Sequence, residues 1–221
     1  MILSLEEKIL RGQLQPGDRL PSENELESEF GISRTVVREG LQSLKSRGMI
    51  ESRRGSGTYV ALPSRELIGD SLTLYASLQR DGKRYLELMD LRILVETEAA
   101  RIVASGTASI ARITAHLDAM ERHLGHPSRF ADADIAFHLS VIKASGHSLF
   151  YVVAEGLLTA PSLSFARSTH GLDPSRAARV LAEHRAIHKA LENRDPGTAS
   201  KAMRSHLRRS RQNLITRLQH A

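Results

Sequence analysis

The sequence contains no cysteine, and this absence excludes several classes of site. Without thiols the chain can form neither a disulfide framework nor an iron–sulfur or thiolate zinc site. Any metal ion must therefore be held by imidazole and carboxylate groups. The chain has ten histidines, so such a site is possible.

Long apolar runs are also absent. No run approaches the roughly 20 apolar residues that a helix needs to cross a bilayer, so we expect no membrane span. The N-terminal stretch MILSLEEKILRG contains acidic side chains, and no apolar core with a small-residue cleavage site follows it, as a signal peptide would require. We therefore expect a cytoplasmic protein.

The charged residues are unevenly distributed along a chain whose formal net charge is +6. Residues 1–33 are net acidic, whereas residues 34–54 carry an excess of arginine and lysine. A basic balance favours polyanionic partners, and a local excess indicates where such a partner would bind. The segment 34–54 is therefore the first candidate for a nucleic-acid contact.

The first 60 residues predict a small mixed domain. Apolar residues at helical spacing predict a short helix that ends before Gly12. Ser22, with Glu25 three residues later, forms the capping-box pattern that begins a second helix, and Ser33 is expected to cap a third. Residues 49–60 then predict two short strands joined by a glycine hairpin. This order of elements is a winged helix-turn-helix.

The third predicted helix is the segment that we expect to enter the major groove of DNA. Its apolar residues are expected to point inward: Val36, Val37, Leu41 and Leu44. Arg34 and Arg38 lie one turn apart on an outward face. A groove-binding helix needs small or polar residues at its start and cations beside them, which Ser33 and Thr35 provide together with the arginines. An arginine can also pair with guanine O6 and N7 and so carry sequence information.

Further basic residues extend this surface. The hairpin tip is suited to close approach to a minor groove or to phosphates, and Arg47 belongs to the same basic segment. We therefore predict contacts with double-stranded DNA from Ser33, Arg34, Thr35, Arg38, Arg47, Arg53, Arg54 and Gly55. The alternative is a winged helix that binds protein and has a merely solvated basic face.

After a linker over residues 61–63 the strand pattern disappears. Amphipathic segments follow one another, and they are separated by breaks at Asp81-Gly82, Ser105-Gly106, Gly125 to Pro127, Ser145-Gly146, Gly171 to Pro174 and Asp195 to Gly197. This pattern predicts a bundle of about seven helices. The expected fold is mainly α, with a winged helix-turn-helix over residues 1–62 and an all-helical domain over residues 63–221.

The helical part contains a candidate metal site. Asp134 and His138 are four residues apart, so they project from one helix face and can bind the same ion. His184 and His206 lie on other predicted helices and would complete a set that suits zinc, nickel or manganese. His188 competes with His184, because it lies one turn later on the same face, and spacing alone does not choose between them.

Both parts of the chain resemble a known family. Three segments resemble the DNA-binding domain of the GntR family: Pro16 to Glu23, Gly31 to Leu41 and Arg54 to Val60. This resemblance implies a homodimer on a short palindromic operator, with Gly55 at the tip of the wing. Residues 64–221 resemble the FCD sensor domain of the FadR subfamily within that family.

The FCD resemblance implies the ligands and the effector class. By that match the metal ligands are Asp134, His138, His184 and His206, and the effector is a small organic acid. Arg92 is then the natural partner of the acid, because a guanidinium can form two hydrogen bonds with a carboxylate. The alternative role for Arg92 is a plain helix salt bridge with Glu96, four residues later.

These features predict a metabolite-responsive transcription regulator and not an enzyme. We expect a repressor that a small organic acid bound at the metal releases from DNA. One alternative is a DNA-binding protein whose metal is structural and whose bundle only dimerises. The other is a metal-dependent enzyme fused to a DNA-binding domain, which is disfavoured because no motif places a general base.

Overall fold

The computed structural model describes residues 1–62, 65–78, 83–159 and 174–219. Its contacts divide the chain into two compact units, Met1–Ile68 and Gly69–Ala221. The division falls inside α4 (Arg65–Ser77), a few residues after the boundary between residues 62 and 63 that the sequence predicts.

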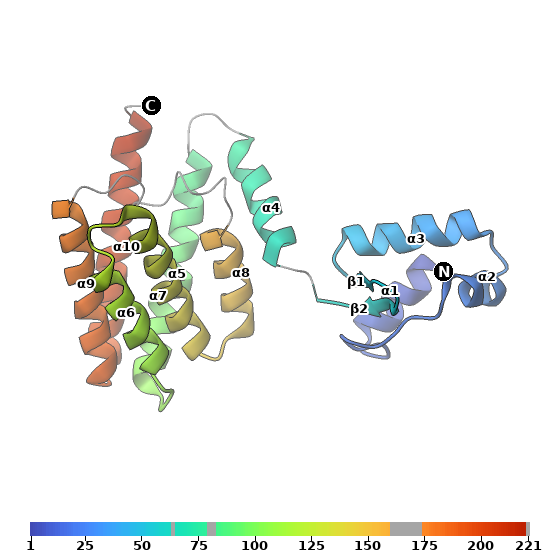
Figure 1. Cartoon of the computed structure of the whole chain (residues 1–221), viewed down its shortest axis with the longest axis horizontal. Helices are drawn as coiled ribbons and strands as arrows, with labels where there is room; N and C mark the ends of the chain where they lie inside the picture. The colour runs from blue at the N-terminus through green and yellow to red at the C-terminus, as the bar shows by residue number, and fades with distance from the viewer. Residues whose placement is uncertain (63–64, 79–82, 160–173, 220–221) are drawn as a thin grey trace. The chain divides into compact units, whose positions relative to one another are not determined.

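The first unit has the elements of a winged helix-turn-helix (Figure 1). In chain order they are α1 (Ile2–Leu10), α2 (Glu23–Phe30), α3 (Arg34–Ser46), β1 (Ile50–Arg53) and β2 (Gly57–Val60). The two strands are antiparallel, with Ile50 opposite Val60 and Arg53 opposite Gly57. This confirms the order of elements predicted from the sequence.

The capping box at the start of α2 forms as the sequence predicts. The Ser22 side chain accepts a hydrogen bond from the Glu25 N–H, and the Glu25 carboxylate accepts one from the Ser22 N–H. Ser33 occupies the same position before α3, but its side chain makes no capping hydrogen bond. The Ser33 hydroxyl is instead exposed.

A small apolar core joins the elements of this unit, and α3 contributes Val37 and Leu44, both fully buried. Val36 is 47% exposed, so the prediction that it points inward was wrong. The physical reason is helical geometry, because Val36 is rotated by about 100° from Val37 around the axis. A Cβ at Gly40 would lie 2.8 Å from Ile2 Cγ1, so glycine there allows α1 to pack closely on α3.

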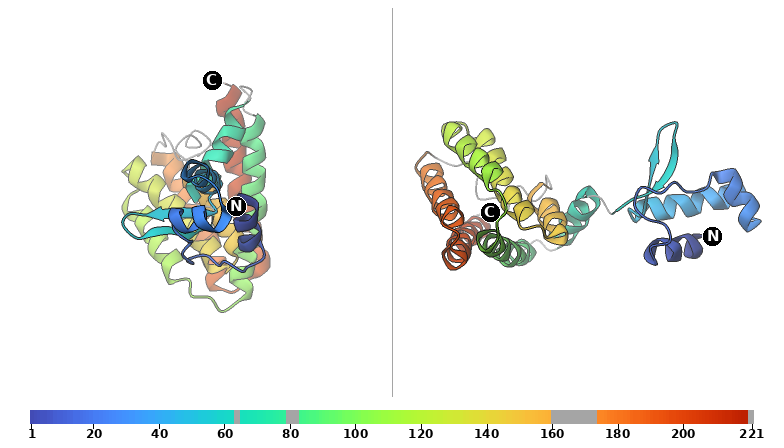
Figure 2. Two further views of the ribbon diagram at one scale, coloured as in Figure 1. Left: turned by 90° about the vertical axis from the view of Figure 1, so that its right-hand side faces the viewer. Right: turned by 90° about the horizontal axis from the view of Figure 1, so that it is seen from below.

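The second unit is a bundle of helices, and its described part contains most of α4, then α5 (Lys83–Ser105), α6 (Ala111–Arg122), α7 (Pro127–Ala144), α8 (Ser148–Thr159), α9 (Pro174–Glu192) and α10 (Pro196–Gln219). Figure 2 shows α5 beside α10, the pair that packs most extensively. The predicted breaks at Asp81-Gly82 and at residues 171–173 lie outside the described residues. The mainly α fold class is confirmed.

The interior of the bundle is mainly apolar, and its buried polar side chains include a group of imidazoles. Phe130 and Phe137 of α7 are fully buried in the core, among side chains from α5, α9 and α10. Three imidazoles share this interior: His138, His184 and His206 are each at most 4% exposed. Within the described ranges, none of the helices combines the length and apolar character of a membrane span.

The capping box gives the first testable prediction. Ser22→Ala removes the cap of α2 and should cost about 1 kcal/mol, so hydrogen exchange of the α2 amides should accelerate about fivefold. The matched control is Ser33→Ala, which removes a side chain that makes no capping hydrogen bond. Exchange in α3 should then change by less than about twofold. Hydrogen–deuterium exchange mass spectrometry of the whole chain measures both, and equal effects would contradict the assignment.

Candidate metal centre and candidate nucleic-acid interface

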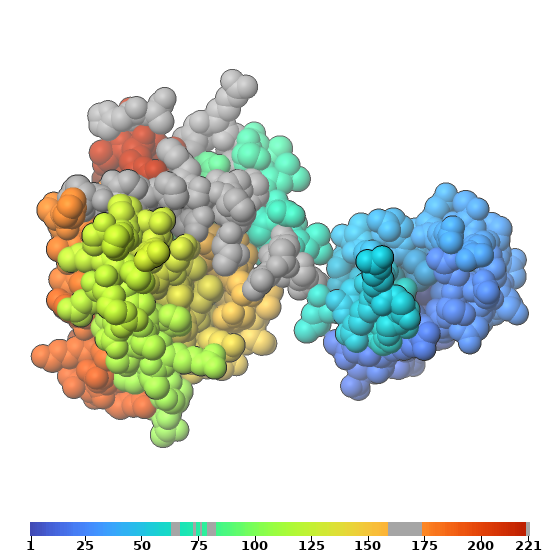
Figure 3. Space-filling view, viewed as in Figure 1, coloured from blue at the N-terminus to red at the C-terminus, as the bar shows by residue number. Residues whose placement is uncertain are grey.

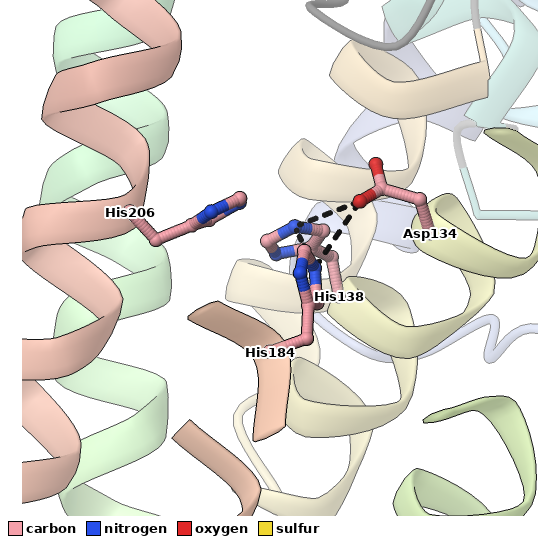
Figure 4. Close-up of side chains that lie close together, drawn as sticks. All are labelled: Asp134, His138, His184 and His206. Atoms are coloured by element: carbon pink, nitrogen blue, oxygen red, sulfur yellow. Dashed lines mark hydrogen bonds and ion pairs between the residues drawn. The ribbon is translucent and has the colours of Figure 1, made fainter. Parts of the chain in front are cut away.

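The centre of the helical unit brings together four side chains from three helices (Figure 4). Asp134 and His138 come from α7, His184 from α9 and His206 from α10. Each offers one ligand atom, and these four atoms all lie within 4.8 Å of one another. The structure therefore places together the four residues that the sequence and the family resemblance singled out.

The distances between the ligand atoms fit a shared ion. Asp134 Oδ1 lies 3.1 Å from His184 Nε2 and 4.0 Å from His138 Nε2, and the two Nε2 atoms are 3.2 Å apart. Ligands held at about 2.1 Å from one ion are separated by about 3 to 4 Å. The observed separations lie in that range.

Oxygen atoms outside the centre orient the three imidazoles. Two of them form a hydrogen bond through Nδ1, His184 with the Val180 carbonyl at 2.8 Å and His206 with Glu183 Oε2 at 2.7 Å, whereas His138 Nδ1 lies in ion-pair contact with Glu96 Oε2 at 2.5 Å. A neutral ring that donates through Nδ1 presents the lone pair of Nε2 on its other side. Metal-ligating histidines are held in this way by carboxylates and carbonyls.

As a result, the acceptor atoms of the three rings and of Asp134 lie close together at the centre. Burial lowers the pKa of His206 well below its ordinary value, so this ring is neutral and can act as a ligand. Asp134 Oδ1 is buried without a hydrogen-bond partner among the described residues. An acceptor buried without a donor is unfavourable unless a cation lies beside it. The donor set and its arrangement therefore fit a divalent metal ion.

The carboxylates of Glu96, which is buried, and of Asp134, which is partly buried, stay ionised. Burial alone would raise the pKa of Asp134, but the adjacent imidazole of His184, 3.1 Å from Oδ1, lowers it below its usual range. Burial likewise opposes ionisation of Glu96, but the charges of Arg92 and His138 lower the pKa of Glu96 to about 2. Both groups are anionic at neutral pH, which suits a site for a cation.

Arg92 is the residue for which the sequence leaves two roles open. Its Nε donates to Glu96 Oε1 at 2.7 Å, and its side chain is 11% exposed. The structure thus contains the helix salt bridge, and Glu96 connects Arg92 to His138. A contact between Arg92 and an effector stays a prediction.

The structure separates His184 from its competitor. His188 is also buried, but its Nε2 forms a hydrogen bond with Thr114 Oγ1 of α6 at 2.7 Å. Its Nδ1 lies 3.5 Å from Glu192 Oε2. His188 is therefore occupied by polar partners away from the centre.

Sequence reasoning missed that Glu96 and Glu183 lie beside the Nδ1 atoms of His138 and His206 and orient these rings. Glu183 is also contacted by Arg209 of α10. The position of Glu183 directly before His184 suggests no contact with His206, because adjacent residues of a helix point about 100° apart. Only the packing of α9 on α10 brings Glu183 to His206.

The exposed face of α3 is the second candidate site. Ser33, Arg34, Thr35 and Arg38 are all exposed. Arg34 and Arg38 direct their Nε atoms to the same oxygen, Glu23 Oε2, at 3.1 and 2.9 Å. The hydrogen bond from Arg38 lowers the pKa of Glu23, which therefore stays ionised. One carboxylate of α2 thus holds both guanidinium groups side by side.

The remaining residues that we predict to contact DNA lie in the wing and at the end of α3. Arg53, Arg54 and Gly55 are exposed at the turn between β1 and β2. Gly55 has φ 71°, a left-handed conformation that glycine adopts without strain. Arg47 forms an ion pair with Glu6 of α1 at 2.7 Å. A DNA contact by Arg47 would have to compete with that pair, whereas no such pair involves Arg54 among the described residues.

Two family models match the chain. Residues 2–60 match the model described as bacterial regulatory proteins, gntR family, and residues 87–209 match the model of the FCD domain. Together the two matches include α1 to β2 and the segment that holds all four candidate metal ligands.

Whole-length relatives agree with these models. The chain is 31% identical over 220 residues to the Glc operon transcriptional activator of Escherichia coli K12, covering 96% of this chain and 86% of the relative. It is 29% identical over 206 residues to the galactonate operon transcriptional repressor of the same organism, covering 91% and 90%. It is also similar to a solved Streptococcus agalactiae GntR structure, with a TM-score of 0.63, 26% identity and coverage of 96% and 97%.

The metal centre can be tested with two matched histidine variants. We expect the wild-type protein to bind about one divalent ion per chain and to lose thermal stability when a chelator removes it. His206→Gln should weaken metal binding by at least about 10- to 100-fold, because it removes a ligand. His188→Gln replaces a buried histidine outside the cluster and should retain the ion. Metal analysis after dialysis measures the content, and similar content in both variants would refute the site.

Proposed function

Because this chain belongs to the GntR family of bacterial regulatory proteins, we propose that it is a repressor that a small organic acid releases from its operator. Its family makes it a DNA-binding, metabolite-responsive transcription regulator with an FCD domain, and not an enzyme. The direction of the response, the effector and the homodimer are the parts that we propose.

The observation that carries the effector proposal is the convergence of four ligand atoms within 4.8 Å inside the FCD domain. A zinc, nickel or manganese ion held there by Asp134, His138, His184 and His206 would retain coordination positions for an anionic oxygen. Such an ion supplies a positive centre that binds a carboxylate. One relative represses an operon named for galactonate, a hydroxylated carboxylate, which supports this class of effector.

Arg92 is proposed to hold the remainder of the acid. A guanidinium has five N–H donors, and the hydrogen bond to Glu96 uses only Nε. Arg92 can therefore keep Glu96 in place and donate to a second carboxylate at the same time. Asp134, with a side chain that is 13% exposed, is the ligand of the cluster most open to solvent.

We infer that α3 enters the major groove of DNA and that the wing lies beside it. Ser33, Arg34, Thr35 and Arg38 would contact bases and phosphates, because they are exposed on one end of α3. Arg47, Arg53, Arg54 and Gly55 would contact the backbone or the minor groove. Two copies of the chain would bind the two halves of a palindromic operator.

A purely structural metal is the second candidate. The deep burial of the three imidazoles favours it, because a fully enclosed ion stabilises a fold without meeting a ligand. In that case the DNA response would not depend on any small molecule.

The DNA assignment predicts different effects for two exposed arginines. Arg38→Ala should weaken binding about 5- to 150-fold, because a lost base contact costs about 1–3 kcal/mol. Arg11→Ala removes an exposed arginine directly after α1 that pairs with Glu7, and it should change affinity by less than about twofold. Both are measured at one salt concentration on a duplex that the wild-type protein selects from a random pool. Wild-type affinity of Arg38→Ala would overturn the interface.

The effector assignment predicts linkage between the metal centre and DNA. Galactonate and other sugar or hydroxy acids are titrated into the operator complex, and one of them should release the DNA. The midpoint should rise at least about tenfold in Arg92→Lys, which keeps the charge but loses the planar fork. By reciprocity, DNA must weaken binding of that acid by the same factor.

His188→Gln serves as the control and should respond as the wild type does. Metal content is measured in each variant, so that a lost ion is distinguished from a lost effector contact. Release at the wild-type midpoint in both Arg92→Lys and the metal-free protein would show that the acid binds elsewhere.

A further inference from the structure

The outer face of α7 forms a groove with α6 and α8, separate from the metal centre. Its cavity volume is about 770 Å³. Figure 3 shows this face of the bundle, where α6 is yellow-green and α8 is gold. From α7 the groove is lined by Ala136, Leu139, Ser140 and Lys143. Asp134 and His138 lie on the opposite face of α7, because residues that differ by two or five positions point to opposite sides of a helix.

The lining combines an apolar floor with cationic and hydroxyl groups. Ile113 of α6 is buried and lies in the floor with Leu139. Arg112 and Lys143 supply the positive charge, and Tyr151 closes the side formed by α8. The Lys143 Nζ lies 5.6 Å from the centroid of the Tyr151 ring. Aspartate and glutamate are absent from the described residues that line the groove.

The two cations of the groove have no carboxylate partner among the described residues, although Tyr151 donates to Glu155 Oε1. Across the described part of the chain, neither Arg112 nor Lys143 has an ion pair with a carboxylate. Many other exposed arginines do have one, such as Arg185 with Glu121 and Arg211 with Asp90. An uncompensated pair of cations above an apolar floor is complementary to an anion that has an apolar body.

His116 also lines the groove, and its pKa reflects the burial and positive charge there. It lines the groove one turn after Arg112. Burial, and then the charge of Arg112, lowers the pKa of His116 below its ordinary value. The imidazole is therefore a neutral polar group at the groove wall, in surroundings that are partly desolvated and positive.

We propose that this groove binds an amphipathic carboxylate, with the carboxylate between Arg112 and Lys143 and the apolar body against Ile113 and Leu139. The volume lies within the range of small-molecule sites, about 300–1,000 Å³. A ligand here contacts α7 from the side opposite to Asp134 and His138. Binding in the groove can therefore reach the metal centre through displacement of one helix.

Octanoate is the probe, and octanamide is its neutral counterpart. Isothermal titration of the metal-loaded protein should show octanoate binding, with octanamide at least about tenfold weaker, because the charged group gains hydrogen bonds from two cations. The double variant Arg112→Gln, Lys143→Gln should weaken octanoate by at least about tenfold. A control double variant, Lys189→Gln, Lys201→Gln, changes two exposed lysines outside the groove and should bind as the wild type does.

The metal centre also attracts carboxylates, so the titration is repeated with His138→Gln and with chelated protein. Persistent octanoate binding in both supports the groove. Binding that disappears with the metal but survives in the Arg112→Gln, Lys143→Gln variant overturns the proposal, as does the absence of octanoate binding or equal binding of octanamide. Light scattering is run on each variant, and a changed oligomeric state in the groove variant would show that this face joins two copies instead.

Discussion

Three imidazoles and a carboxylate buried in an apolar bundle are the constraint on which the C-terminal unit depends. A polar group moved from water into such a core destabilises the fold unless it finds a partner. The outer nitrogen of each ring faces a carboxylate or carbonyl oxygen, and the four inner atoms meet where a cation fits. The helices that supply them, α7, α9 and α10, must pack in one register, because a slip of one turn moves a ligand by about 5.4 Å.

Glu96 and Glu183, which lie beside the outer nitrogens of His138 and His206, are themselves held by arginines. Arg92 holds Glu96 from the same helix, α5, whereas Arg209 of α10 contacts Glu183 of α9. Each arginine thus acts on a candidate ligand through a carboxylate, and such outer partners fix the orientation and basicity of the rings. If the proposed acid binds Arg92, the hydrogen bond from Arg92 to Glu96 links that acid to the support of His138. This is a physical route from an effector to the metal centre that requires no large movement.

The N-terminal unit uses a carboxylate in a different setting. Glu23 is accessible to solvent, so its ion pairs with Arg34 and Arg38 add little to stability. Their effect is on geometry, because both guanidinium groups are restrained before DNA is present. Restraint of this kind lowers the entropy lost on binding, since fewer rotamers have to be frozen.

The sequence by itself determined the order of helices and strands, because caps, glycine breaks and apolar periodicity act within a few residues of one another. The prediction of inward-pointing residues was wrong at Val36, which is exposed although the next residue of the helix, Val37, is buried. The spacing of residues left His184 and His188 open, because both share a face of α9, and it was the family resemblance that implied His184. Tertiary structure decided that choice, because Thr114 of α6 takes His188 while α7 and α10 meet at His184. Contacts of this kind depend on the register and crossing of helices that are distant in the chain, which no local pattern encodes.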